Sequence, residues 1–382
     1  PTSLSFIIEQ NHDVFAGQKS SSAQSCRVRI IECENYIVSP GIFDCHVHVL
    51  GGGGEKGPDS RTPSVSGREM ANFGVTSFIG LLGTDFVSRS SQDLHAKIRS
   101  LAKYGLKAWM FCGSYQMTPI VNTLTGSVSS DICHVDEVLG VGEVCVSDFR
   151  GNLPTSFELA RLVNEASVAG MLSGKKAVVH CHIGNNRAGI EPLLEAVQLH
   201  QVPVHALHPT HCSRSDHVLE QAKKWLALGG TADFTADQEG FGVRETATSD
   251  ALHQLRLDNL PISRCTLSSD AHGSFSTFDD SGNVTSYGMF TQRNLAKTMS
   301  RLIHTYGWTR SEVMSLCTTN IADFLKLPNV GRIQQGCEAD LLLFEHDKFL
   351  DLDRGLDFVF SRGRMLKEKD WVQPEMFDSW AC

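Results

Sequence analysis

The sequence has no long apolar run and no excess of positive charge. None of its 382 residues lies in a stretch that approaches the ~18 uninterrupted apolar residues of a membrane span. The formal net charge is −9, from 34 Lys and Arg against 43 Asp and Glu. Because nucleic-acid binding requires a basic surface that meets the phosphates, we expect neither a nucleic acid nor a membrane as a partner.

Disulfide-type cysteine spacing is also missing. The 12 cysteines are scattered over the chain without a C-x-x-C pair, and several stand in apolar runs, where a reduced thiol packs as a small apolar group. The opening residues PTSLSFIIEQNHD are too few and too polar for a signal peptide. We therefore expect a cytoplasmic protein without structural disulfides. Histidine, by contrast, is abundant with 16 residues, which is a first indication of metal binding.

From about residue 42 the chain alternates short apolar runs with helix-like segments. Helical apolar spacing is found, for example, in 157–172 and 217–228, and again in 292–305 and 310–325. The strand-like runs are IFDCHVHVL, GVTSFIGLLG, LKAWMFCGSY, VLGVGEVCVSD, KAVVHCHIG, VPVHALH, GTADFTAD and RCTLSSD. Eight successive βα units predict a (β/α)8 TIM barrel over residues 41–329, and a doubly wound open sheet is the alternative.

The two ends of the chain have a different pattern. Residues 1–40 and 330–382 contain short strand-like runs separated by turns, as in GRIQQGCEADLLLFEHD. The simplest arrangement packs both ends together. We therefore expect one small β-domain formed by 1–40 and 330–382.

The segment DCHVHVLGGGGE, residues 44–55, combines two histidines, a glycine run and an acid. Side chains alternate along a strand, so His46 and His48 point the same way. Both fall at the C-terminal end of the first strand, where barrel enzymes place their active sites. Two imidazoles so placed can bind one metal ion, although a pair of buried, hydrogen-bonded histidines is the alternative.

Later strands favour the metal over buried histidines. Their ends carry further histidines and acids, namely Glu143 in the fourth, His180 and His182 in the fifth, His208 and His211 after the sixth, and Asp270 after the eighth. In a barrel these strand ends meet at one mouth. Such clustering over several strands is improbable by chance, and it predicts a metal centre.

This pattern resembles the amidohydrolase superfamily and, more closely, the isoaspartyl dipeptidases. The H-x-H pair is common among amidohydrolases, whereas the glycine run with Glu55 and the segment GLLGTD are more specific. The closer likeness is carried by PGIFDCHVHVLGGGGEKGPDSRTP, GVTSFIGLLGTD, LTGSV, SDFR, PTHCSR, TLSSDAHGS and GRIQQGCEADLLLF. It extends from residue 38 to about 365.

The resemblance implies two divalent metal ions, expected to be zinc. The implied ligands are His46, His48 and Asp270 for one ion and His182 and His211 for the other. Glu143 stands where many relatives bridge the pair with a carboxylated lysine, and the fourth strand of this chain contains no lysine. His180, His208 and His272 are expected to be neighbours of the ligands.

The activity that the resemblance implies is hydrolysis of β-aspartyl (isoaspartyl) dipeptides by a hydroxide that the two ions activate. Asp270 would shuttle the proton to the leaving amine, and Tyr115 would stabilise the oxyanion. The implied substrate-binding residues are Glu55 and Thr84 near the ammonium, and Arg150, Arg214 and Ser274 at the carboxylates. The resemblance also implies a homo-oligomer, with an octamer as the expected size.

Two other functions stay open. Another amidohydrolase, of the dihydroorotase, hydantoinase or N-acyl-amino-acid deacylase type, would share the metals, but its substrate would offer Glu55 no free α-amino group. A non-catalytic scaffold would typically have lost metal ligands, whereas all the expected positions are filled here.

Overall fold

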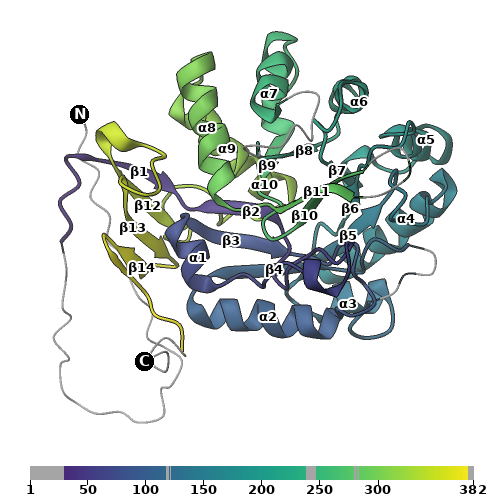
Figure 1. The fold of residues 1–382 in the computed structure, drawn as a ribbon, viewed down its shortest axis with the longest axis horizontal. Helices are drawn as coiled ribbons and strands as arrows, with labels where there is room; N and C mark the ends of the chain where they lie inside the picture. The colour runs from purple at the N-terminus through teal and green to yellow at the C-terminus, as the bar shows by residue number, and fades with distance from the viewer. Residues whose placement is uncertain are drawn as a thin grey trace.

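The computed structural model describes residues 30–117, 120, 122–237, 247–278, 281 and 284–376. Its eight parallel strands, in chain order, pair as a six-stranded sheet followed by a two-stranded one, and together they form a barrel (Figure 1). Two junctions of the barrel are closed by backbone hydrogen bonds, from Cys212 N to Asp233 O (3.1 Å) and from Asp270 N to His46 O (3.1 Å). The strands are β2 (Ile42–Val47), β3 (Val75–Gly80), β4 (Lys107–Cys112), β5 (Val138–Cys145), β6 (Val178–His182), β7 (Leu207–Thr210), β8 (Ala232–Thr235) and β9 (Cys265–Ser268). The predicted TIM-type architecture is confirmed.

Helices alternate with these strands and pack their apolar faces on the barrel. The longest, α4, begins with a capping box in which Thr155 and Glu158 satisfy each other's backbone N–H groups, and it ends at Gly174 in the left-handed conformation. The others that follow the strands are α1 (Gly67–Asn72), α2 (Ser91–Tyr104), α3 (Val128–His134), α5 (Glu191–His200), α6 (Asp216–Ala227) and α7 (Thr248–Leu257), with α4 at Ser156–Ser173. The helices expected over 157–172 and 217–228 are confirmed within one residue at each end.

Two elements differ from the sequence prediction. The segment 310–325 is not one helix but two, α9 (Arg310–Leu316) and α10 (Thr319–Phe324), after α8 (Arg293–Tyr306). The break occurs because the Cys317 carbonyl accepts a hydrogen bond from Phe43 N of β2 (2.8 Å). Strand β7 begins only at Leu207, because Val204–Ala206 forms a 3-10 turn.

Both ends of the chain contribute to one antiparallel sheet beside the barrel, as predicted (Figure 1). Its strand order is β1 (Tyr36–Pro40), β12 (Leu341–Glu345), β13 (Leu356–Ser361), β14 (Arg364–Glu368) and β15 (Trp371–Val372). Hydrogen bonds tie it to the barrel, from Arg362 to the Leu106 carbonyl (2.8 Å) and from the Tyr104 hydroxyl to the Gln373 carbonyl (2.6 Å). The strands expected in 1–29, and residues 377–382, lie outside the described residues.

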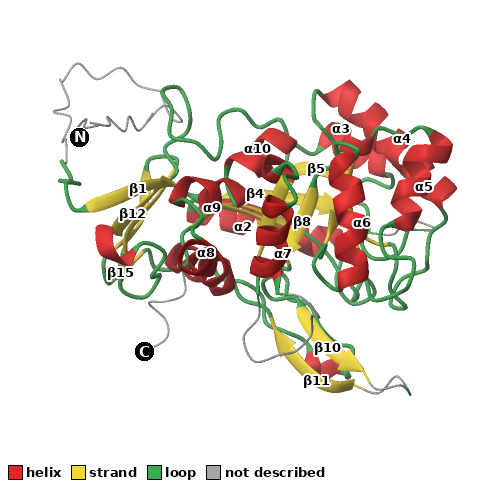
Figure 2. Cartoon of the chain, turned by 90° about the horizontal axis from the view of Figure 1, so that it is seen from above, coloured by secondary structure: helices red, strands yellow, loops and turns green. Residues whose placement is uncertain are grey.

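A two-stranded hairpin that the sequence did not predict follows β9 directly. It consists of β10 (Ser274–Phe278) and β11 (Val284–Met289), and Figure 2 shows it extending away from the barrel helices. Ser274 pairs with Met289 at the barrel end of the hairpin. The hairpin therefore places residues from both of its strands near the barrel mouth.

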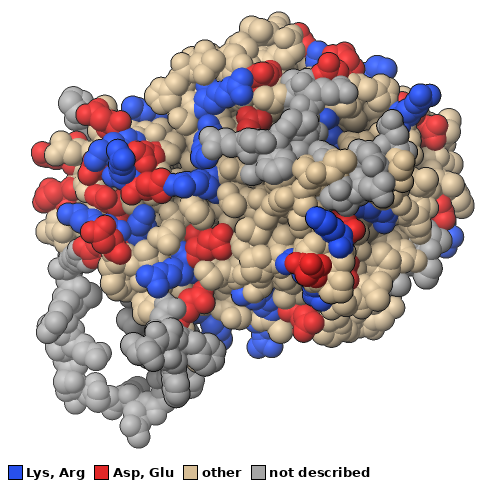
Figure 3. Space-filling model, viewed as in Figure 1, with Lys and Arg blue, Asp and Glu red and all other residues tan. Residues whose placement is uncertain are grey.

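Acidic and basic side chains are intermingled on the face of the molecule drawn in Figure 3. Among the residues that the structure describes, no helix combines the length and the apolar character needed to cross a bilayer.

Candidate metal centre

Six ligand-type side chains from five strand ends converge inside the barrel mouth. They are His46 and His48 at the end of β2, Glu143 on β5, His182 on β6, His211 after β7 and Asp270 after β9. All six are buried. The ligand atoms of His46, His48 and Asp270 lie within 4.8 Å of one another, as do those of His46, Glu143 and His211.

One group forms around the H-x-H pair. Asp270 Oδ1 lies 3.1 Å from His48 Nε2 and 3.4 Å from His46 Nε2, and the two Nε2 atoms are 3.4 Å apart. Two imidazole nitrogens and a carboxylate oxygen therefore point at one another, which is a donor set that suits zinc.

Glu143 connects this group with a second one. Its Oε1 atom lies 2.7 Å from His182 Nδ1 and 3.0 Å from His211 Nε2. Its Oε2 atom faces the other way, 3.5 Å from His46 Nε2 and 3.9 Å from His48 Nε2, and is buried without a hydrogen-bond partner. A buried carboxylate oxygen is costly when it is unpaired, so this arrangement fits a carboxylate that places one oxygen on each of two cations.

Two of the six ligand-type residues have an unusual backbone conformation. His211 and Asp270 have positive φ angles of 65° and 55°, in a region that residues other than glycine rarely adopt. Such conformations gather at functional sites, where the surrounding structure holds them in place. His211 directly follows β7 and Asp270 lies two residues after β9, so the turn there directs each side chain into the mouth.

Charges in the cluster favour a cation. Burial lowers the pKa of His46, but Glu143 and Asp270 outweigh it and raise that pKa to about 9. Burial opposes ionisation of Asp270, yet His46 and His48 bring the pKa of this carboxyl down to about 2. Burial likewise acts against the Glu143 carboxylate, while His46 and His182 hold its pKa well below the ordinary value. Two ionised carboxylates at this depth require positive charge nearby, and the cluster is consistent with a metal site.

Asp148 is a site residue that the sequence analysis missed. Its carboxylate accepts hydrogen bonds from Arg150 Nη2 (2.8 Å) and Arg150 Nε (3.0 Å) and lies 3.1 Å from His182 Nε2. Arg214 Nη1 approaches it to 3.6 Å. Asp148 thus contacts both predicted arginines and one of the six ligand-type side chains. Its place in the segment SDFR, two residues before Arg150, was the available signal.

A third group of ligand-type atoms lies behind the centre and comprises Cys145, Asp148 and His182. Burial, with the nearby Asp148 carboxylate, raises the pKa of the Cys145 thiol. A metal requires the thiolate, so this group is a poorer cation site than the two at the mouth.

Glu55 lies beside the centre with its carboxylate held from several sides. The Ser274 hydroxyl donates to its two oxygens at 2.9 and 3.0 Å, and Tyr287 OH lies 3.3 Å from Oε2. Arg150 Nη1 approaches Oε1 to 3.4 Å. In this structure Ser274 therefore contacts Glu55, and Tyr287 from β11 is a further residue that the sequence analysis missed.

The glycine run brings Glu55 to this place. Gly53 has φ 76°, and a Cβ atom there would overlap the Tyr287 hydroxyl and the Ser60 carbonyl. His272 was expected as a neighbour of the ligands. Its ring contacts the same loop, with Nδ1 2.7 Å from the Pro63 carbonyl. The Gly52 N–H donates to the His272 carbonyl (2.8 Å).

Tyr115 is buried and reaches the centre. Its hydroxyl lies 2.8 Å from His182 Nδ1, and the Arg150 guanidinium lies 5.7 Å from its ring centre. Burial and the nearby Glu143 raise the pKa of Tyr115 well above its ordinary value, so the hydroxyl remains a hydrogen-bond donor. Thr84 is half-buried in the loop after β3, and its carbonyl accepts a hydrogen bond from Phe86 N.

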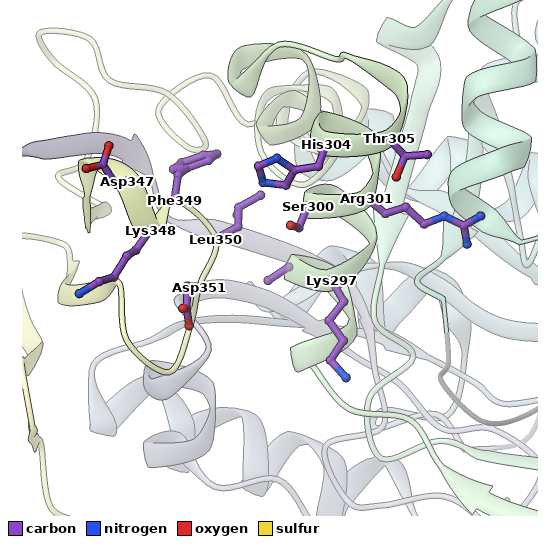
Figure 4. A pocket seen from close by; sticks show the side chains of 11 residues that line it. Lys297, Ser300, Arg301, His304, Thr305, Asp347, Lys348, Phe349, Leu350 and Asp351 are labelled. Carbon is purple, nitrogen blue, oxygen red and sulfur yellow. The ribbon is translucent and has the colours of Figure 1, made fainter.

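A surface pocket away from the barrel mouth contains none of these residues (Figure 4). It lies between α8 and the segment 347–351. Its ionisable lining residues are Lys297, Arg301, His304, Asp347, Lys348 and Asp351. Arg301 already pairs with Asp250 at 2.6 Å, and the predicted chemistry is not found there.

Comparison with known proteins gives one family and a set of similar structures. A model of the amidohydrolase family matches residues 37–366. The crystal structure of a β-aspartyl dipeptidase from thermophilic, keratin-degrading Fervidobacterium islandicum AW-1, in complex with β-Asp-Leu dipeptide, has 36% sequence identity and a TM-score of 0.84. That match covers 90% of this chain and 88% of the other.

A second structure of the β-aspartyl dipeptidase from Fervidobacterium islandicum AW-1 has 34% identity and a TM-score of 0.83, and the match covers 94% of this chain and 90% of that one. A D-hydantoinase structure has 16% identity and a TM-score of 0.63, over 90% of this chain and 88% of that one. At this low identity the hydantoinase shares the fold, and the likeness carries no further conclusion.

Proposed function

Because this chain belongs to the amidohydrolase family, we propose that it is a metal-dependent dipeptidase that hydrolyses β-aspartyl (isoaspartyl) linkages. The observation that carries the proposal is the position of Glu55. This acid lies 3.4 Å from Arg150, whose other guanidinium nitrogen lies 3.4 Å from the metal-site residue His182. An anion and a cation for substrate groups thus stand together beside the reaction centre. The similarity to β-aspartyl dipeptidase structures supports the same substrate.

The proposed metal ligands are the six converging side chains. His46, His48 and Asp270 would hold one divalent ion, His182 and His211 the other, and Glu143 would bridge the two through its separate oxygens. When bound, two divalent ions, zinc in this proposal, supply a water molecule of lowered pKa and polarise the scissile carbonyl.

Asp270 and Tyr115 carry the remaining chemistry in this proposal. The Asp270 carboxylate, ionised at neutral pH, accepts the proton of the attacking water and returns it to the leaving amine. The protonated Tyr115 hydroxyl, which already points at the centre, donates a hydrogen bond to the oxyanion that develops on the carbonyl oxygen.

Substrate recognition follows from the β-linkage itself. A β-aspartyl residue carries its α-amino and α-carboxylate groups on one carbon, away from the scissile carbonyl. Glu55, with Thr84 nearby, would receive the ammonium, while Arg150, Arg214 and Ser274 would receive the carboxylates. In an α-linked peptide the ammonium stands beside the scissile carbonyl, so the acid and the arginines cannot all be satisfied at once.

The test is a rate comparison with the metal-loaded enzyme on β-Asp-Leu, α-Asp-Leu and N-acetylated β-Asp-Leu. Sites that pair buried polar groups with the substrate reject mismatched analogues by up to ~10⁴–10⁵. We expect strong preference for free β-Asp-Leu. Equal rates on the free and the acetylated substrate would contradict the role of Glu55 and favour the deacylase alternative.

The proposal extends to assembly and location. We propose a homo-oligomer, with the octamer as the size to test, whose catalytic barrel comprises residues 41–329 and whose small domain comprises 1–40 and 330–382. A reducing cytoplasm agrees with the cysteines, because all ten that the structure describes are free.

A further inference from the structure

A chain of buried hydrogen bonds runs from His46 away from the metal centre. His46 Nδ1 lies 2.9 Å from His180 Nε2, and His180 Nδ1 lies 3.0 Å from His208 Nδ1. His208 Nε2 lies 3.2 Å from the Thr266 hydroxyl, which donates to Asp233 Oδ1 at 2.6 Å. All five side chains are at most 2% exposed, so water does not compete with these contacts.

Asp233 determines which atom donates and which accepts in each of these hydrogen bonds. The hydroxyls of Thr210 and Ser268 donate to its Oδ2 atom at 2.7 and 2.6 Å, in addition to Thr266 on Oδ1. A carboxylate surrounded by hydroxyl donors is an acceptor only. The Thr266 hydrogen is therefore committed to Asp233, and the Thr266 oxygen accepts from His208 Nε2–H.

The donor and acceptor roles of the histidine nitrogens then follow one from another. A neutral imidazole has one donor and one acceptor nitrogen. Since His208 donates through Nε2, its Nδ1 accepts from His180 Nδ1–H. His180 Nε2 in turn accepts from His46 Nδ1–H. Each proton thus points away from the metal centre.

The consequence appears at the far end, on His46. Its Nδ1 keeps a proton, and its Nε2 atom is the nitrogen that faces His48, Asp270 and Glu143 at 3.4–3.5 Å. We infer that the His180–His208–Thr266–Asp233 chain is a positioning device that fixes the tautomer and ring orientation of His46 for metal binding. This inference rests on the proposed role of His46 as a ligand.

Aromatic rings hold His180 and His208 in place. The Phe111 ring stacks on His180 with centres 5.2 Å apart, and the Phe324 ring lies 4.4 Å from the centre of His208. Apolar rings offer no alternative hydrogen-bond partner. The rings therefore confine His180 and His208 to the partners within the chain.

Thr266→Val is the main test, because it removes one hydroxyl at nearly constant volume. Without an acceptor for His208 Nε2–H, nothing fixes the tautomers of His208 and His180. Removing an outer partner of a ligating histidine typically lowers metal affinity by ~10–100-fold. We expect a loss in this range for Zn²⁺, measured by competition with a chromophoric chelator on the full-length metal-free protein, and an altered absorption spectrum with Co²⁺.

Matched variants distinguish an effect of the hydrogen-bond chain on metal affinity from a general loss of stability. Thr266→Ser keeps the hydroxyl and should restore the affinity. Thr210→Val removes one of the two hydroxyl donors to Asp233 Oδ2 but leaves Ser268 on that oxygen and Thr266 on Oδ1, so Asp233 still accepts from Thr266 and the metal affinity should stay near wild type. His208→Leu breaks the chain one step closer to His46 and should weaken binding at least as much as Thr266→Val. Thermal unfolding of each metal-free variant reports the structural cost separately.

Two results would overturn the inference. One is wild-type Zn²⁺ affinity and Co²⁺ spectrum in Thr266→Val and His208→Leu. The other is an equal loss of affinity in Thr266→Val, Thr266→Ser and Thr210→Val. A wild type that binds metal but does not cleave β-Asp-Leu would contradict the proposed substrate alone. A wild type that binds no divalent ion would contradict both the proposed function and the inference about His46.

Discussion

Replacing Glu55 by Gln tests the substrate proposal most directly, because it removes one charge and almost no volume. The Glu55 side chain is 8% exposed, so water screens its charge only weakly. A hydrogen bond to a charged group contributes about 1.5–3 kcal/mol. At about 1.36 kcal/mol for each factor of ten in rate, kcat/KM for β-Asp-Leu should fall by roughly 10- to 150-fold.

The assay compares kcat/KM for free and N-acetylated β-Asp-Leu in the wild type and the variant. Because Glu55 would contact the substrate ammonium and not a metal ion, Glu55→Gln should keep the wild-type metal content while its preference for the free amine shrinks. Asp59→Asn is the matched control, since it removes the same charge from an exposed position in the same loop and should change neither value. A Glu55→Gln enzyme with unchanged kcat/KM and unchanged preference would refute the reasoning.

Other predictions concern the metals, the proton shuttle and the terminal sheet. Chelators should abolish activity and added Zn²⁺ should restore it; a fully active preparation without metal in elemental analysis would contradict this. Glu143→Ala should lose at least one bound ion with the fold preserved by circular dichroism, and full occupancy would exclude bridging. Asp270→Asn should lower turnover by at least ~10²–10⁴-fold in steady-state assays, and near-normal turnover would place the shuttle elsewhere. The hydrogen bond to Asp357 raises the pKa of Tyr36 to about 12, so its stabilising effect should be full below pH ~10 and vanish as the pH rises through 12. Tyr36→Phe should lose this pH dependence in denaturant unfolding, and an unchanged pH dependence would contradict it.

The sequence by itself predicted the order of the elements and the gathering of histidines and acids at one end of the barrel. Apolar runs that alternate with helical segments reflect burial on both faces of parallel strands, and this property is visible in the local sequence. Residues two apart on a strand share a face, so His46 and His48 could be paired from spacing alone. Barrel topology placed the histidines and acids of later strands at the same mouth, and their roles as ligands came from the resemblance to amidohydrolases.

Only the tertiary structure decided which distant residues meet. Asp148 contacts His182 and Tyr287 contacts Glu55 across long sequence separations, and Tyr287 belongs to a hairpin that the sequence did not predict. The break between α9 and α10 depends on a hydrogen bond from Phe43, far away in the chain. The relay behind His46 joins residues 134 positions apart, His46 and His180, through ring nitrogens whose partners are fixed by packing. Local spacing encodes which face a side chain occupies, whereas hydrogen-bond partners across the barrel depend on the register and closure of all eight strands.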